Sequence, residues 1–157
     1  LSHLEFFGAF VLAACVRGML VGLGVWAAAA WFVALPLAHP VYLLLFAILG
    51  SAALGTLGMI AGIWAEKFDQ LAGFQNFIVL PLSFLSGVFY SIHSLPAFWL
   101  TLSHFNPFFY MIDGFRYGFF GVSDVSPLLS LAVIGAFFLA LTGVALGMLK
   151  TGYKLRD

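Results

Sequence analysis

Two charged residues stand out in a stretch of the chain that is otherwise apolar. Asp113 and Arg116 lie three positions apart, so they would share one face of a helix. One interpretation is a local ion pair that lets a short helix lie at a membrane surface. The other is that both residues border a path for a substrate, because ionisable groups in or near a membrane often serve transport. Their spacing leaves both interpretations open.

Other residues that could do chemistry do not form a recognisable site. None of the four histidines has a second histidine three or four positions away, and the single cysteine, Cys15, lies in an apolar run. We therefore predict no metal site and no disulfide. Ser86 could be an intramembrane nucleophile only with a histidine base inside the membrane, and we expect His93 near the outer surface. The sequence has no GxxxxGK[ST] loop, so we predict no catalytic residue and no cofactor in this chain.

The composition is that of a membrane protein. Hydrophobic residues make up 64% of the chain and charged residues 8%, whereas a soluble domain needs about 25% charged residues. The formal net charge is zero, which gives no basic surface for nucleic acid. The length suits a single transmembrane domain at 1–157.

Four apolar runs predict spanning helices, because a bilayer core of about 30 Å takes about 20 helical residues. We place these helices at about 8–35, 41–65, 71–91 and 128–149. Arg17 interrupts the first, about two turns inside, where its aliphatic stem would let the charge reach the near surface. Pro81 lies in the third and predicts either a fixed kink or a point of bending.

The stretch from Leu80 to Gly121 is hydrophobic but too broken to span. Pro96 and Pro107 divide it, and each half is shorter than the bilayer core. Charge gives the orientation, since lysine and arginine near span ends prefer the cytoplasm. If the stretch does not cross, both termini and all the basic groups beside the spans are cytoplasmic: Lys67, Lys150, Lys154 and Arg156. We therefore predict an all-α polytopic protein with four spans and a re-entrant pair of short helices at about 96–120, on the outer side.

Small residues predict where spans pack closely, because packing in lipid depends on close backbone approach. Three spans carry glycines four positions apart: Gly18 with Gly22, Gly58 with Gly62, and Gly143 with Gly147. Glycine is also common in membrane helices, so each pair alone is a weak signal.

One short polar loop lies between the second and third predicted spans. It contains Glu66, Lys67 and Asp69 and would lie in the cytoplasm. It is either a solvated turn or a contact with a cytoplasmic partner.

Two segments carry a resemblance to a known family. The segments PLSFLSGVFYSIHSLP (Pro81 to Pro96) and FNPFFYMIDGFRYGFFG (Phe105 to Gly121), followed by a last span and a basic tail, resemble the permease subunit of ABC-2 type exporters. The resemblance covers most of the chain and is greatest to bacterial permeases that export polysaccharides, lipo-oligosaccharides and drugs. It implies an inner-membrane protein with six spans, of which this chain, beginning at Leu1, would be a fragment holding the third to the sixth.

The resemblance also implies partners and roles. Two permease copies would bind two cytoplasmic ATPase subunits, which would hold ATP and magnesium, while membrane lipids would surround the spans. Glu66, Lys67 and Asp69 would face the ATPase. The outer exit of the substrate path would be bordered by Phe89, Tyr90, Tyr110, Asp113 and Arg116. The alternative is a membrane scaffold or assembly subunit that transports nothing.

Overall fold

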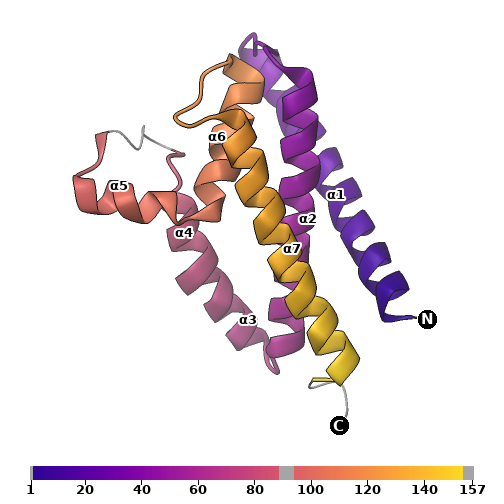
Figure 1. Cartoon of the computed structure of the whole chain (residues 1–157). Coiled ribbons are helices and arrows are strands. Elements are labelled where there is room, and N and C mark those ends of the chain that lie inside the picture. The colour runs from indigo at the N-terminus through magenta and orange to yellow at the C-terminus, as the bar shows by residue number, and fades with distance from the viewer. Residues whose placement is uncertain (1, 89–93, 154–157) are drawn as a thin grey trace.

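The computed structural model of the chain describes residues 2–88 and 94–153. Every regular element in these residues is a helix, which confirms the predicted all-α class (Figure 1). Within the described residues, three helices are long and apolar enough to cross a membrane: α1 (His3–Phe32), α2 (Pro40–Trp64) and α7 (Pro127–Thr151). These three helices fit a polytopic membrane protein.

The starts of the long helices follow from local sequence. Ser2 caps α1 in a capping box, in which the Glu5 amide donates to the Ser2 hydroxyl at 3.2 Å and the Ser2 amide donates to the Glu5 carboxylate at 2.8 Å. With this cap α1 begins at His3, five residues before the predicted start of the first span at Gly8. Proline is the first residue of both α2 and α7, where its missing N–H costs nothing.

The third predicted span differs most from the structure. Residues 68–84 divide into α3 (Phe68–Phe74), the π-helix η1 (Gln75–Val79) and α4 (Leu80–Phe84). The wide turn directly precedes Pro81, whose ring would clash with the carbonyl four residues back in a regular helix. The helix ends at Phe84, and Gly87 takes a left-handed φ of 80°, so the prediction of a helix continuing to Ser91 is wrong. A fourth span stays a prediction.

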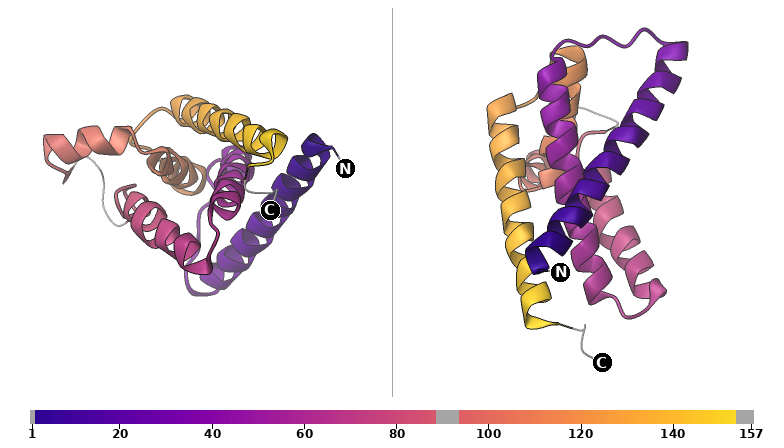
Figure 2. Two further views of the ribbon diagram at one scale, coloured as in Figure 1. Left: turned by 90° about the horizontal axis from the view of Figure 1, so that it is seen from below. Right: turned by 90° about the vertical axis from the view of Figure 1, so that its right-hand side faces the viewer.

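The helices run up and down between two ends of the bundle. The start of α1, the loop between α2 and α3 and the end of α7 lie at one end, which we call the terminus end (Figure 1). The α1–α2 connection, the end of α6 and the start of α7 lie at the opposite end, called here the far end (Figures 1 and 2). The start of α1 and the end of α7 thus lie at the same end of the bundle. That the terminus end is cytoplasmic stays a prediction.

The predicted pair of short helices is present as α5 (Ala97–His104) and α6 (Pro107–Phe120). α5 projects sideways from the bundle, whereas α6 rises between α2 and α7 to the far end (Figures 1 and 2). Asn106 forms the corner, because its side chain accepts from the Phe108 amide at 3.0 Å and donates to the Leu82 carbonyl at 2.6 Å. Asn106 therefore holds the start of α6 beside α4.

Two glycines in α6 allow it to pack directly on α2. At Gly118 an added Cβ would lie 2.9–3.1 Å from the Leu43 backbone and Cβ, and at Gly114 it would overlap the Phe46 ring. Phe46 is fully buried at the centre of the main core, with residues of α6 and α7 around it. The backbone of Ala38 and His39 then donates to the Phe119 and Gly118 carbonyls at 3.1 and 2.9 Å.

The six glycines predicted to mediate packing have different surroundings. Gly18 packs tightly against Ser51 of α2. The other five have no atom within 4 Å of an added Cβ among the described residues: Gly22, Gly58, Gly62, Gly143 and Gly147. Close packing at these five would need a partner beyond the described residues and stays a prediction.

Arg17 lies deeper than the sequence suggested. Its neighbour Gly18 packs against Ser51, and Ser51 lies near the middle of α2, which runs from Pro40 to Trp64. Arg17 therefore lies near mid-depth of the bundle, not about two turns from its surface. Its side chain is exposed.

We predict that Gly118→Ala destabilises the protein by about 2 kcal/mol, because the new methyl group would press on the Leu43 backbone, which cannot move aside as a side chain can. The midpoint of heat unfolding in detergent measures the effect. Gly135→Ala is the matched control, since nothing lies within 4 Å of its added Cβ. Equal stability of the two variants would contradict the close contact.

We predict that single cysteines at Ser94 and Ser123, in a Cys15→Ser background, both react with a membrane-impermeant reagent added outside intact cells. These residues precede α5 and follow α6, and we expect the chain between them not to cross the membrane. Labelling of one cysteine from outside and of the other only in inverted vesicles would show a crossing.

Candidate functional site

Asp113 lies at the centre of a polar cluster near the far end of the bundle. The residue is 1% exposed, and its two carboxylate oxygens accept from the backbone amides of Asp124 and Val125 at 2.7 and 3.3 Å. Burial raises the pKa of this carboxyl, although the two backbone donors favour the charged form. Asp113 thus fixes the turn that leads from α6 into α7.

Arg116 extends the same cluster to a third segment. Its guanidinium donates to the Asp124 carboxylate at 3.0 Å and to the Gly87 carbonyl at 2.7 Å, whereas the Asp113 carboxylate is 3.9 Å away. We call Asp113, Arg116, Asp124 and Gly87 the far-end cluster. It connects the turn after α4, the middle of α6 and the turn before α7.

The geometry revises the predicted local pair of Asp113 and Arg116. They share a helix face, but each has a closer partner outside the helix. Asp124 and Gly87 were not among the predicted site residues. Each residue has a weak signal in the sequence. Asp124 shortly precedes Pro127, which starts a helix. Gly87 follows an apolar helix, and a glycine in the left-handed conformation often ends a helix at such a position.

The other predicted residues of the outer exit are only partly described. The buried Tyr110 donates its hydroxyl to the His104 carbonyl at 2.8 Å and thereby ties α6 to the end of α5. Phe89 and Tyr90 lie outside the described residues. An exit lined by these side chains stays a prediction.

An aromatic cluster lies beside the far-end cluster, where α2 begins. The rings of His39 and Tyr117 stack with their centroids 4.5 Å apart, and Tyr42 meets Tyr117 edge-on at 5.2 Å. These rings join the start of α2 to the last turn of α6.

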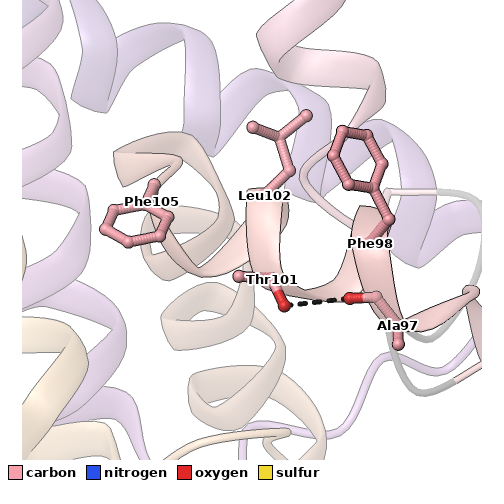
Figure 3. Close-up of a pocket in the computed structure, with 5 residues that line it drawn as sticks. All are labelled: Ala97, Phe98, Thr101, Leu102 and Phe105. Carbon is pink, nitrogen blue, oxygen red and sulfur yellow. Dashed lines mark hydrogen bonds between the residues drawn. The ribbon is translucent and has the colours of Figure 1, made fainter.

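A shallow apolar groove follows one side of α5. Its volume is about 390 Å³, and Figure 3 shows the side chains that line it: Ala97, Phe98, Thr101, Leu102 and Phe105. The Thr101 hydroxyl donates to the Ala97 carbonyl at 2.9 Å, so the only polar side chain of the groove is already satisfied within the helix. The groove suits apolar groups, because its other lining side chains are apolar.

The predicted partner-facing loop lies at the terminus end. Glu66, Lys67 and Asp69 are exposed, and Lys67 and Asp69 lie at the start of α3. The Glu66 amide donates to the Gln70 side chain at 2.8 Å, which closes the loop into a tight turn. Three charged side chains are thus presented on a short, ordered turn.

The described residues include Ser86, which the sequence raised as a possible nucleophile. Ser86 is buried, and its hydroxyl donates to the Ser83 carbonyl, so it is not presented as a nucleophile. No group of three or more His, Cys, Asp or Glu residues in the described part could hold a metal ion.

Comparison with known proteins decides the family. The sequence pattern of the ABC-2 type transporter family matches residues 1–120. The chain belongs to this family. The inner membrane transport permease YadH of Escherichia coli (strain K12) is 37% identical over 141 residues, which are 90% of this chain and 55% of YadH. This ABC-2 chain therefore spans about half the length of the curated relatives that it matches most extensively.

Two further relatives of this ABC-2 chain match shorter segments. The capsule polysaccharide export inner-membrane protein BexB of Haemophilus influenzae is 32% identical over 93 residues, 56% of this chain and 34% of BexB. Nodulation protein J of Rhizobium leguminosarum bv. trifolii is 31% identical over 68 residues, 43% of this chain and 26% of that protein. No solved structure matches the chain.

We predict that Asp113→Ala destabilises this ABC-2 chain by about 2 kcal/mol, because two partly buried backbone amides lose their acceptor. The midpoint of heat unfolding should fall, and a protease should cut the turn at residues 121–126 faster. Asp69→Ala is the control, since that side chain is exposed. Equal cleavage rates in both variants would show that Asp113 does not hold the turn.

Proposed function

We propose that this chain is part of the permease of an ABC-2 exporter in the bacterial inner membrane. The observation that carries this proposal is the family match over residues 1–120. The permease would move a lipid-linked glycan, a polysaccharide or a hydrophobic drug-like compound outward. A partner ATPase would hydrolyse ATP, with magnesium bound in that partner. The name of BexB, a capsule polysaccharide export protein, supports this direction and class of substrate, and the name of YadH, an inner membrane transport permease, supports transport.

The two ends of the bundle suit the two tasks of such a permease. The charged turn of Glu66, Lys67 and Asp69 lies at the terminus end and is exposed, as a contact for a cytoplasmic ATPase would need to be. The far-end cluster and α5 lie where the substrate would leave, if the terminus end is cytoplasmic. Closure of the ATPase pair would then shift the population between two packed arrangements of the helices.

The permease itself would do no covalent chemistry. Its described polar side chains in the far-end cluster hold backbone groups and one another, so their task is to position the end of α4, α6 and the start of α7. Two permease copies would together enclose the substrate path, with α5 and α6 bordering its outer mouth. The aromatic cluster of His39, Tyr42 and Tyr117 would lie beside that mouth.

We predict that the intact permease, affinity-purified from its native membrane, recovers an ABC ATPase. Reversing the loop charges with Glu66→Lys, Lys67→Glu and Asp69→Lys should weaken the complex about tenfold, because like charges would then face each other across the contact. Val122→Ser is the matched control, as it changes an exposed residue at the far end.

Transport is tested in inverted vesicles that contain both proteins, with a fluorescent lipid-linked oligosaccharide and a hydrophobic dye as probes. ATP-dependent uptake of at least one probe, abolished when the ATPase cannot hydrolyse ATP, is the expected result. A permease that is recovered without an ATPase, and whose vesicles take up neither probe, would instead be a scaffold or assembly subunit.

A further inference from the structure

Arg17 is a charged residue in the middle of a helix that is otherwise apolar. Its neighbour Gly18 packs on Ser51 near the centre of α2, which places Arg17 near mid-depth of the bundle. The Arg17 side chain is exposed, and α1 is the least covered of the three long helices. In its most apolar window 6% of residues are buried, against 33% in α2 and 17% in α7.

Among the described residues, no free acidic group lies at the depth of Arg17. Among the described residues Arg17 has no hydrogen-bond or ion-pair partner. Glu66 is 15 residues from Ser51, about 20 Å along the helix direction. Both carboxylate oxygens of Asp113 are engaged at the far-end cluster. The remaining described acidic residues lie near the start of α1, at the start of α3 or at the far end: Glu5, Asp69 and Asp124. Asp157 lies outside the described residues.

Lipid is a poor partner for a cation at this depth. Half of a bilayer core is about 15 Å, which is farther than an arginine side chain reaches from its backbone. The charge would have to draw water or headgroups into the membrane, which is why arginines at mid-span usually face protein or a water-filled cavity. The exposed surface of α1 around Arg17 is therefore expected to be covered in the assembled permease.

The surface that continues from Arg17 has a shape that suits a helix. Phe6, Phe10 and Arg17 are four and seven residues apart and share one face of α1. Near the terminus end α1 diverges from α2, and Phe6 and Phe10 line a groove of about 630 Å³ between the two helices (Figure 2). Gly58 and Gly62 of α2 also line this groove, and a Cβ added at either glycine would have no atom within 4 Å.

We propose that this groove and Arg17 form the docking surface for a transmembrane helix that is not among residues 1–157 and that carries an aspartate or glutamate at mid-depth. The open glycines Gly58 and Gly62 would let its backbone approach α2, as small residues do between membrane helices. Its carboxylate would pair with Arg17. The curated relatives are nearly twice as long as the segment they share with this chain, so these permeases contain further residues that could supply such a helix.

A second copy of residues 1–157 does not fit this surface, because the described helices offer no free carboxylate at mid-depth. Removing the charge of Arg17 should change stability in opposite directions in the two cases, contact with a partner helix and contact with lipid. An arginine that faces lipid is a burden, so Arg17→Leu would raise stability. An arginine paired with a buried carboxylate is needed, so the same change would leave that carboxylate unpaired.

The experiment uses the full-length permease in its native membrane and measures the yield of monodisperse protein after detergent extraction. We expect Arg17→Leu to lower this yield about tenfold, since breaking a buried pair is strongly destabilising. Arg17→Lys should retain most of it. Leu12→Ala is the control, because Leu12 is also exposed on α1 but lies on another face. This readout does not require transport, so it is independent of the proposed function.

The partner is identified with Arg17→Glu. Revertants selected for restored yield should carry Lys, Arg or Gln in place of an acidic residue in a membrane helix outside residues 1–157. The proposal is overturned if Arg17→Leu folds as well as the parent. Intact transport in that variant would then indicate that Arg17 contacts lipid, and lost transport would indicate that it binds an anionic substrate. It is equally overturned if Arg17→Lys lowers the yield as much as Arg17→Leu does. The same holds if the compensating substitutions of the revertants lie within residues 1–157.

Discussion

The far end of this bundle depends on how closely α6 approaches α2. Because Gly114 and Gly118 carry no side chains, the Phe46 ring and the Leu43 backbone lie directly against α6. At this separation the amides of Ala38 and His39 reach carbonyl groups of the last turn of α6. A bulkier residue at either glycine would move α6 outward, and these backbone donors would lose their acceptors.

The need to satisfy backbone groups explains the far-end cluster. Turns that lie near or within a membrane must satisfy their backbone groups inside the protein. Asp113 does this for Asp124 and Val125, and Arg116 does it for Gly87. These charged residues thus hydrogen-bond to the backbone of two turns that are distant in sequence, although their spacing of three suggested that they would pair with each other. This arrangement keeps the cluster compatible with a place at the mouth of a transport path, since Arg116 remains partly exposed.

Sequence patterns predicted the features that depend on local chemistry. Apolar runs located the long helices, and Pro107 and the glycine at position 121 predicted the bounds of α6. Features that depend on how helices cross could not be predicted in this way. Gly18 and Gly62 look alike in sequence, yet only Gly18 lies where α1 meets α2. The break after Phe84 was missed because hydrophobicity continues through it while the backbone turns at Gly87.

The chain between α4 and α6 is tied at both of its ends. The Arg116 guanidinium donates to the Gly87 carbonyl and the Asn106 side chain donates to the Leu82 carbonyl, so the end of α4 is held beside α6 whatever lies between Gly87 and Asn106. Insertions or exchanges within that segment, which contains α5, would leave its two ends in place, as they do in compact surface loops whose ends are close. The segment can therefore diversify during evolution while the bundle stays unchanged.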